Sequence, residues 1–408
     1  MLKQIKVLWI GDGGTPTGFS TVNHNIIDNL PDGKYDVHHL AINYFGDPTP
    51  YKHKMYPAQL GGDLWGYGRL LNMLQVVKPD FIFILNDVWV ISRYLEIMKQ
   101  FTNITLPPIV VYYPVDSTEL DPIYFKDFDI VSKAVVYTQF GFEESLKAHE
   151  KDYSVIYHGV DTEVFKRLPE PKGVLRKRLF TNDETLQSED AFIILNANRN
   201  QPRKHIDTTI EAFKLFSEGK PANVKLYLHM GTRDAGWDII RLMQRYGIDN
   251  RLVITNLSSE TQKVGLERLN LIYNVCDVGV NTSTGEGWGL VSVEHAATGA
   301  PQVVGNHSAC AEIFGDVGLL ADTKATYIEQ STMTRHSLLD PVSVAEKFEL
   351  LYTNPELRKE LGKNSIEKLH KKQYSWRAIA KQWDTLFDSL EPRPVQEVST
   401  NDNSVAGA

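Results

Sequence analysis

Along the chain, short runs of apolar residues alternate with longer stretches whose apolar residues recur at helical spacing. A run that is apolar at every position is typical of a strand buried on both faces, as in a parallel sheet covered by helices. The aromatic and glycine-rich stretch 44–68 has neither pattern and is predicted as a long loop. In the first part of the chain the strand-like runs are Ile5–Ile10, Val37–Ile42, Phe81–Leu85, Ile109–Tyr113 and Ala134–Tyr137, and the helix-like runs are Val22–Leu30, Leu70–Val77 and Val88–Lys99.

The same alternation begins again after 158-HGVDTEVF-165. Two series of strands and helices predict an α/β protein with two parallel-sheet domains, 1–160 and 161–373. An amphipathic helix is predicted over 374–390, and the polar tail 391–408 is predicted to be disordered. In this part the strand-like runs are Phe192–Leu195, Val224–His229, Leu252–Thr255, Val278–Asn281 and Gln302–Val304, and the helix-like runs include Ile206–Phe216 and Leu290–Ala297.

Composition narrows the classes of function. With 408 residues, 42% hydrophobic and 23% charged, the chain has the length of two globular domains. Its net charge of −8 and the lack of a long basic run argue against broad binding to nucleic acid. Cys276 and Cys310 lack metal-ligand spacing and are predicted to be reduced core thiols. Because we find neither a signal-peptide core nor an apolar stretch of about 20 residues, we expect a cytoplasmic protein without a membrane span.

The first candidate site is the glycine-rich stretch 11-GDGGTPTGFS-20, between a predicted strand and a predicted helix. Open parallel sheets bind ligands at the carboxyl ends of their strands, and Gly13, Gly14 and Gly18 would let the backbone approach a phosphate or a sugar. The stretch fits neither the dinucleotide fingerprint, which needs an acid at the end of the second strand, nor a P-loop, which needs Lys followed by Ser or Thr. Ligand binding and simple turn geometry both remain open.

The second candidate, 196-NANRNQPRK-204, follows the first strand of the second series. Arg199 and Lys204 bracket the turn into a helix, with Arg203 between them. A guanidinium fork, an ammonium group and a helix N-terminus can together hold a diphosphate. The alternative is an ordinary surface loop with solvated bases.

The third candidate is 285-GEGWGLVSVEHAATGAP-301, where a strand, a glycine loop and a helix follow one another. Glu294 falls in the first turns of that helix, and its side chain would lean back toward the loop. A carboxylate there can accept two hydroxyls, as from a ribose, while Glu286 in the loop can accept sugar hydroxyls. A first-turn acid also complements the helix dipole, so Glu294 alone does not establish a site.

Two other features resemble catalytic motifs without supporting them. Asp127 and Asp129 have the DxD spacing of metal-dependent sugar transfer, but they lie between a helix and a strand, where aspartates commonly form surface turns. His158 and His307 could act as bases, although a lone histidine near a strand end is more often structural. We therefore predict no metal site and no dedicated catalytic base.

Taken together, these stretches resemble the GT-B glycosyltransferases of family 4, the retaining, glycogen-synthase-like group. The most specific part is Glu286 and Glu294, separated by seven residues and followed by 299-GAP-301, which is similar to the Glu-x7-Glu signature of the family. The hinge-like 159-GVD-161, followed by a phenylalanine, is nearly as typical. The resemblance implies two Rossmann-like doubly wound domains facing a central cleft. The first would bind the acceptor, the second would bind the donor, and the C-terminal helix would pack back onto the first.

The resemblance also implies a role for each matching residue. Arg199 and Lys204 would neutralise the diphosphate, Glu294 would bind the ribose, and Glu286 would contact the donor sugar near C3 and C4. Backbone amides of the loop before the helix would support the sugar and the phosphate, and the glycines of the first domain would face the diphosphate from the other side. The implied donor-binding residues are Gly13, Gly14, Gly18, Trp288, Gly289, Leu290 and Glu294.

The sequence departs from the family pattern at one important position. Many members have a histidine at the end of the strand that here reads 110-VVYYPVD-116. The nearest polar residue is Asp116, which could meet the donor hydroxyls or the acceptor. The stretch 322–340 is also longer than the usual link.

The implied reaction transfers a sugar from a UDP- or GDP-sugar to an acceptor hydroxyl, with retention at the anomeric carbon. The departing phosphate can accept the proton of the acceptor, so the reaction requires no cofactor, metal or protein base. The acceptor could be a glycan, a small molecule or, less in keeping with the charge, a protein or nucleic acid. The alternatives are a nucleotide-sugar epimerase and a nucleotide-sugar-binding protein that does not transfer.

Overall fold

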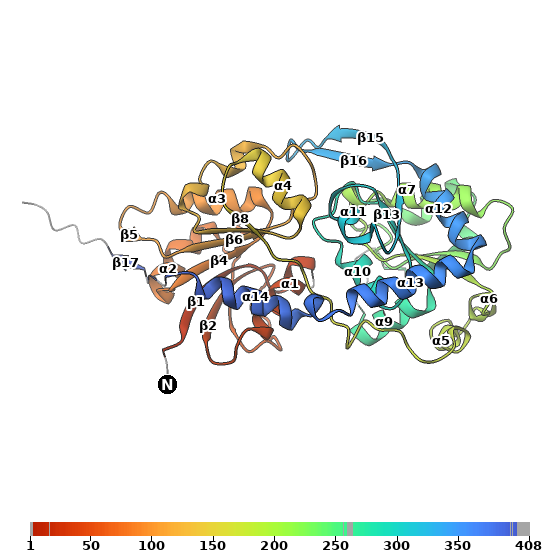
Figure 1. Cartoon of the computed structure of the whole chain (residues 1–408), viewed down its shortest axis with the longest axis horizontal. Coiled ribbons are helices and arrows are strands. Elements are labelled where there is room, and N and C mark those ends of the chain that lie inside the picture. Colours follow the sequence, from red (N-terminus) through yellow and green to blue (C-terminus); the bar gives the residue numbers. More distant parts are fainter. Residues whose placement is uncertain are drawn as a thin grey trace, which may run out of the picture.

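The computed structural model describes residues 3–15, 17–255, 257–258, 264–391, 393 and 395–397. They form two α/β units that lie side by side, each built on one parallel sheet (Figure 1). None of the helices in these ranges is long and apolar enough to cross a membrane.

The first sheet has seven strands, all parallel, in the order β3-β2-β1-β4-β6-β7-β8. Its central strands are buried along their whole length, which explains why they read as continuous apolar runs. Along β1 the side chains alternate between the faces: Trp9 packs toward one hydrophobic core and Leu8 toward another. The strands are β1 (Ile5–Asp12), β2 (Tyr35–Ile42), β3 (Lys54–Pro57), β4 (Phe81–Leu85), β6 (Ile109–Tyr113), β7 (Lys133–Val136) and β8 (Tyr153–Val155).

The predicted loop 44–68 is wrong in one part, because β3 lies within it and extends the sheet beyond β2. This strand has four residues, none of them buried, so it lacks the apolar run by which the other strands were found. The helices of this half cover both faces of the sheet: α1 (Gly18–Asn29), α2 (Leu70–Val77), α3 (Val88–Met98) and α4 (Gln139–Ala148).

The second sheet has six parallel strands in the order β11-β10-β9-β12-β13-β14. Cys276 and Cys310 are buried in the core beside it and are free thiols, as predicted. The strands are β9 (Phe192–Asn196), β10 (Val224–Leu228), β11 (Leu252–Ile254), β12 (Val278–Asn281), β13 (Gln302–Gly305) and β14 (Leu319–Ala321). The helices are α5 (Lys172–Leu179), α6 (Glu184–Gln187), α7 (Ile206–Ser217), α8 (Ile239–Arg245), α9 (Leu266–Val275), α10 (Leu290–Ala297), α11 (Ser308–Phe314), α12 (Pro341–Thr353) and α13 (Pro355–Leu369).

The last helix, α14 (Trp376–Asp388), returns to the first unit and packs against α1 (Figure 1). Its Trp383 and Phe387 lie fully buried against the aromatic rings of the first sheet. The two chain crossings between the units touch each other, since the Val160 amide donates to the Tyr374 carbonyl at 2.8 Å. Hydrophobic packing also connects the units, because one cluster of buried apolar residues includes members of both.

Two smaller sheets lie outside the main ones. The stretch 322–340 contains an antiparallel hairpin, β15 (Thr323–Ile328) and β16 (Arg335–Leu339), which reaches toward the first unit (Figure 1). The predicted disordered tail lies mostly outside the described residues. Within it, β17 (Gln396–Glu397) pairs with β5 (Ile104–Thr105), so the expectation of disorder is wrong for these two residues.

Candidate active site

The loops that follow the strands of the two sheets face each other between the units. Gly18 begins α1 and Leu290 begins α10, and a Cβ added at Gly18 would lie 3.6 Å from Leu290 Cδ1. The two glycine-rich stretches singled out in the sequence are thus brought together, with the N-termini of their helices adjacent. Such a place suits an anionic ligand, because the N–H groups of a helix N-terminus carry partial positive charge.

The glycines of the first loop are required by packing. A Cβ at Gly13 would lie 2.7 Å from the Ala41 Cβ on β2, and one at Gly14 would overlap the backbone of Asn43 and the next residue. The loop is held from within as well, since the Thr17 hydroxyl donates to Asp12 Oδ2 at 2.7 Å. Close packing against β2 is therefore enough to explain Gly13 and Gly14, whether or not a ligand binds there.

The second loop packs against the first unit. A Cβ at Gly285 would overlap the Asp116 carbonyl oxygen, and one at Gly287 would overlap Pro114. Gly289 has a φ of +85°, a left-handed conformation that strongly favours glycine. It occupies the N-cap position of α10, where among the described residues no side chain accepts a hydrogen bond from the first helical N–H groups. The first N–H groups of α10 are thus left uncapped at the end of the loop.

Glu286 is the centre of a buried charged group. It forms an ion pair with Lys204, and Asn281 Nδ2 donates to its Oε1 at 2.9 Å. Its own amide donates to the Ser308 hydroxyl at 3.1 Å, which fixes the backbone of the loop. Burial opposes ionisation, but Lys204 and Arg203 outweigh it and lower the pKa of Glu286 to about 2. The carboxylate is therefore ionised throughout the physiological range.

The arginine beside this group is Arg203. Its Nη1 lies 3.8 Å from Glu286 Oε2 and 4.0 Å from Asp116 Oδ2. Pro202–Lys204 form a single 3-10 turn, which turns both Arg203 and Lys204 toward the second glycine loop. From the sequence, Arg203 was noted only for its position between Arg199 and Lys204, the two cations predicted to bind the diphosphate.

Arg199 is placed differently from its predicted partner. Its Nε and Nη2 donate to the two carboxylate oxygens of Asp234, at 2.7 and 3.0 Å, and its side chain is about half exposed at 48%. The structure thus brings Lys204 and Glu286 together, while Arg199 forms a bidentate ion pair outside that group.

Glu294 lies on α10, one turn beyond Leu290. The Tyr273 hydroxyl donates to its Oε2 at 3.2 Å. Desolvation in these surroundings, supported by the negative charge of Asp161 and only partly offset by the Tyr273 hydrogen bond, raises its pKa to about 8. The two glutamates of the motif therefore stand in opposite electrostatic surroundings.

Sequence reasoning missed Asp87, which follows β4 and begins α3. Burial raises its pKa to about 7, with a further contribution from Asp116 and an opposing one from Arg203. Burial also raises the pKa of Asp12, while Thr17 lowers it. The rule that selected the other loops, a polar residue directly after a buried strand, would have selected Asp87 as well.

Several buried polar atoms beside Trp288 have no hydrogen-bond partner among the described residues. They are the Trp288 Nε1, the Tyr137 hydroxyl and both ring nitrogens of His158. The rings pack together, with centroids 4.1 Å apart for Tyr137 and His158 and 5.5 Å apart for His158 and Trp288. Burial lowers the pKa of His158 to about 3, so its ring is neutral. Unpaired groups of this kind offer places for a ligand or water molecules.

Asp127, Asp129 and His307, which resembled catalytic residues in the sequence, make ordinary contacts. Asp127 and Asp129 both pair with Lys99, at 3.2 and 3.0 Å. His307 faces Ser308 through Nδ1 at 3.2 Å, and burial lowers its pKa to about 4.

The chain is similar to known proteins in part of its sequence and in its fold. Residues 178–368 match the family model described as "Glycosyl transferases group 1". No sequence among the curated proteins matches the chain. The match therefore concerns the second unit, where Lys204, Glu286 and Glu294 lie.

Solved structures are similar over nearly the whole chain. Sucrose-phosphate synthase from Thermosynechococcus elongatus superposes with a TM-score of 0.70 at 16% identity, covering 95% of this chain and 98% of its own. HepE from Anabaena, in complex with UDP-glucose, gives 0.68 at 17% identity and covers 95% and 100%. WaaG, a glycosyltransferase involved in lipopolysaccharide biosynthesis, gives 0.68 at 12% identity and covers 94% and 100%. The fold is thus GT-B, as the resemblance in the sequence implied.

Proposed function

We propose that this protein is a retaining glycosyltransferase that moves a sugar from a UDP- or GDP-sugar to an acceptor hydroxyl. The observation that carries the proposal is the buried Glu286–Lys204 ion pair, with Arg203 beside it, next to the uncapped start of α10. Positive side chains and helix N–H groups at one point suit a diphosphate, and a carboxylate beside them suits sugar hydroxyls. The group 1 match of the second unit and the UDP-glucose complex of HepE support this choice of substrate class.

The donor would lie along the second glycine loop. Its sugar would contact Glu286, its phosphates would meet Lys204 and the amides of Gly289 and Leu290, and its ribose would bind Glu294. Two ribose hydroxyls that donate to Glu294 would favour the ionised carboxylate, against the burial that raises its pKa. Donor binding should therefore lower the pKa of this group.

Bond cleavage would place extra negative charge on the β-phosphate. Lys204 is held by its buried ion pair with Glu286, and Arg203 lies beside it with its side chain 45% exposed. Charges and helix amides that are in place before the reaction are usually the largest source of catalysis. Arg199 would join them only by leaving Asp234, which makes its predicted role the one most open to experiment. The departing phosphate would take the proton of the acceptor, so no metal or cofactor is needed for this step.

The test is release of the nucleotide from UDP-, GDP- and ADP-sugars, with and without a panel of sugar acceptors. We expect slow release without acceptor for one nucleotide, and none from a Lys204→Met variant whose folding is verified by circular dichroism. If no nucleotide sugar is bound or cleaved by the wild-type protein, the proposal fails.

A nucleotide-sugar epimerase is a second candidate, which Asp87 favours. A carboxyl group with a pKa of about 7 can exchange protons near neutral pH, as an epimerase requires. Incubation of the donor without acceptor, followed by NMR of the sugar ring protons, distinguishes the two. An epimerised sugar that is absent with Asp87→Asn would support this candidate, and an unchanged ring would exclude it.

A further inference from the structure

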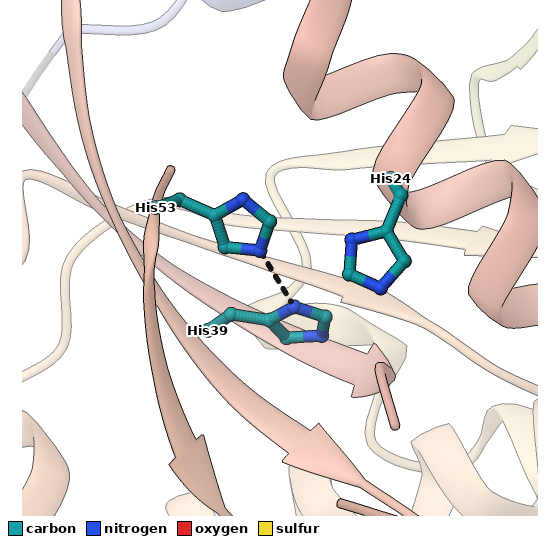
Figure 2. A group of neighbouring side chains, drawn as sticks. All are labelled: His24, His39 and His53. Carbon is teal, nitrogen blue, oxygen red and sulfur yellow. Dashed lines mark hydrogen bonds between the residues drawn. The ribbon is translucent and has the colours of Figure 1, made fainter. Parts of the chain in front are cut away.

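Three histidines from separate elements converge behind the first glycine loop. His24 lies on α1, His39 on β2, and His53 directly precedes β3 (Figure 2). One ring nitrogen from each lies within 4.8 Å of the other two, and this is the one group of metal-ligand type found among the described residues. His24 and His39 are buried, and His53 is half-buried.

The outer nitrogens of two rings are engaged with backbone carbonyls. His24 Nε2 donates to the Gly13 carbonyl at 2.9 Å, and His39 Nε2 donates to the Gly11 carbonyl at 3.1 Å. A carbonyl can only accept, so each Nε2 carries the proton and each Nδ1 of the neutral ring keeps a lone pair. Metal-bound histidines show this same pattern, in which the outer N–H is held by a carbonyl and the inner nitrogen faces the ion.

One pair of inner nitrogens has the spacing of ligands: His39 Nδ1 and His53 Nε2, which share a hydrogen bond, are 3.4 Å apart. All three ligand atoms lie within 4.8 Å of one another. A tetrahedral zinc ion with bonds of about 2.0–2.1 Å to nitrogen separates its ligand atoms by about 3.3 Å. The third ligand position falls to His24 Nδ1, which is buried and has no hydrogen-bond partner among the described residues.

The rings are also held in place by their surroundings. The Tyr51 ring stacks on the His24 ring, with centroids 3.3 Å apart and planes 6° from parallel. Three imidazoles are thus held close together, and His24 Nδ1 is a buried nitrogen that a metal ion could engage.

We propose that His24, His39 and His53 bind one divalent transition-metal ion, with zinc as the best fit to three imidazoles at this spacing. The ligand atoms are Nδ1 of His24, Nδ1 of His39 and Nε2 of His53, and a water molecule completes the tetrahedron. The ion would link three parts of the first unit: the helix α1, the strand β2 and the segment that precedes β3.

The role of this ion is structural. The same rings that would bind it hold the Gly11 and Gly13 carbonyls, so it stabilises the first glycine loop from behind. It does not reach the phosphates in the proposed reaction, and sugar transfer remains independent of a metal at the bond that breaks. The inference does not rest on the proposed function.

The test measures metal content and affinity in the full chain, purified with a tag that contains no histidine. We expect about one zinc per chain by plasma mass spectrometry after dialysis, and a Co²⁺-substituted protein with the intense visible absorption of tetrahedral coordination. His53→Ala is the chief variant, because its half-buried position before an edge strand makes unfolding unlikely to confuse the result. Losing this ligand should weaken zinc binding at least about 100-fold. Removing a group that only hydrogen-bonds to a metal ligand already lowers metal affinity about 10- to 100-fold.

His38→Asn is the matched control. His38 precedes His39 on β2, but its ring faces Tyr56 and Asp36, at 3.0 and 3.2 Å, outside the cluster. This variant should keep wild-type zinc affinity and the Co²⁺ spectrum. The proposal is overturned if metal-free wild-type protein does not bind added zinc by calorimetry, or if His53→Ala and His39→Asn bind it as tightly as the wild type does.

Discussion

The two glycine-rich loops that meet between the units are built for different reasons. In the first, Gly13 and Gly14 are needed because neighbouring atoms of β2 and the following loop fill the space of a Cβ. In the second, Gly289 provides a left-handed turn above a buried ion pair. Glycine content alone does not distinguish a tight turn from a ligand site. The second loop differs from the first in having the buried ion pair of Glu286 and Lys204 beside it.

The largest expected effect comes from Lys204→Met, which removes the positive charge that pairs with Glu286 of the second loop. Turnover should fall about 10²–10³-fold, the usual loss for one preorganised charge donor. The free energy of unfolding should also fall by about 3–5 kcal/mol, because Glu286 is left buried without its partner. Steady-state kinetics and urea unfolding measure the two.

A double variant, Lys204→Met with Glu286→Gln, separates these effects. It should regain stability but not turnover; recovery of turnover would contradict the charge assignment.

The pH dependence of the free energy of unfolding tests the same ion pair. Glu286 has a lowered pKa, so its stabilisation is complete above its unfolded pKa of about 4.3 and is lost as the pH falls toward 2. The stability gap between wild type and Lys204→Met should therefore narrow below pH 4.

Arg203→Ala and Arg199→Ala sharpen the comparison further. Arg203 lies beside Glu286, whereas Arg199 is held by Asp234. We expect about a 10²-fold loss of turnover for Arg203→Ala and less than about a tenfold loss for Arg199→Ala. The opposite order in kcat would restore the role that the resemblance implies for Arg199.

The packing of the first loop is tested by Gly14→Ala against Gly18→Ala. The first change forces a methyl group into backbone atoms and should lower the free energy of unfolding by about 1–3 kcal/mol. At Gly18 the nearest atom is Leu290 Cδ1 at 3.6 Å, an ordinary contact, so stability should hardly change. Equal losses in thermal unfolding would show that the first loop is not built by packing.

If Glu294 binds the ribose as proposed, Glu294→Gln should raise the donor KM about tenfold with little change in kcat, because one charge-assisted hydrogen bond is lost. In the wild type, donor affinity should improve as the pH rises toward 8, where the group ionises. The variant should lose that dependence. A fall in kcat alone would place Glu294 elsewhere in the mechanism.

Asp87→Asn should give the smallest change. The pKa of Asp87 is raised, so ionisation destabilises the folded state as the pH rises from about 4 to about 7. The variant should therefore melt a few degrees higher than the wild type at pH 8 and at the same temperature at pH 4. Parallel melting curves from pH 4 to 9 would show that Asp87 does not titrate in this range.

Much of the fold was predictable from the sequence because its strands are buried. Phe81–Leu85, Ile109–Tyr113 and Val278–Asn281 were predicted at the bounds the structure has, since each is buried throughout and the first two are apolar at every position. The edge strand Lys54–Pro57 was missed, because a short strand without buried residues has no such run. The pairing of Gln396–Glu397 with a distant strand leaves no local pattern at all.

The candidate site was predictable to the level of which loops meet. Lys204 and Glu286 were both chosen from positions after buried strands, and the structure pairs them. The partner of Arg199 was not predictable, because Asp234 lies on another loop and the 3-10 turn decides that Arg203 is the arginine that faces Glu286. The histidine cluster was not predictable either. Its members come from α1, β2 and the segment before β3, and their meeting depends on how these elements pack rather than on any spacing in the sequence.

The hairpin β15–β16 adds a backbone contact between the units, apart from the chain crossings and from Glu312 of α11, which accepts from the Gln139 and Phe140 amides of α4. Besides the chain crossings at Val160, the Thr118 amide donates to the Arg335 carbonyl at 3.1 Å, and the Arg335 amide donates back to Thr118 at 2.9 Å. An exposed ion pair between Arg335 and Glu119 adds little to these bonds. At about 0.5–1.5 kcal/mol for each hydrogen bond, the hairpin adds a small but specific contribution to the contact between the units. Because both bonds are formed by backbone groups, substitution of the hairpin side chains should leave this contribution in place.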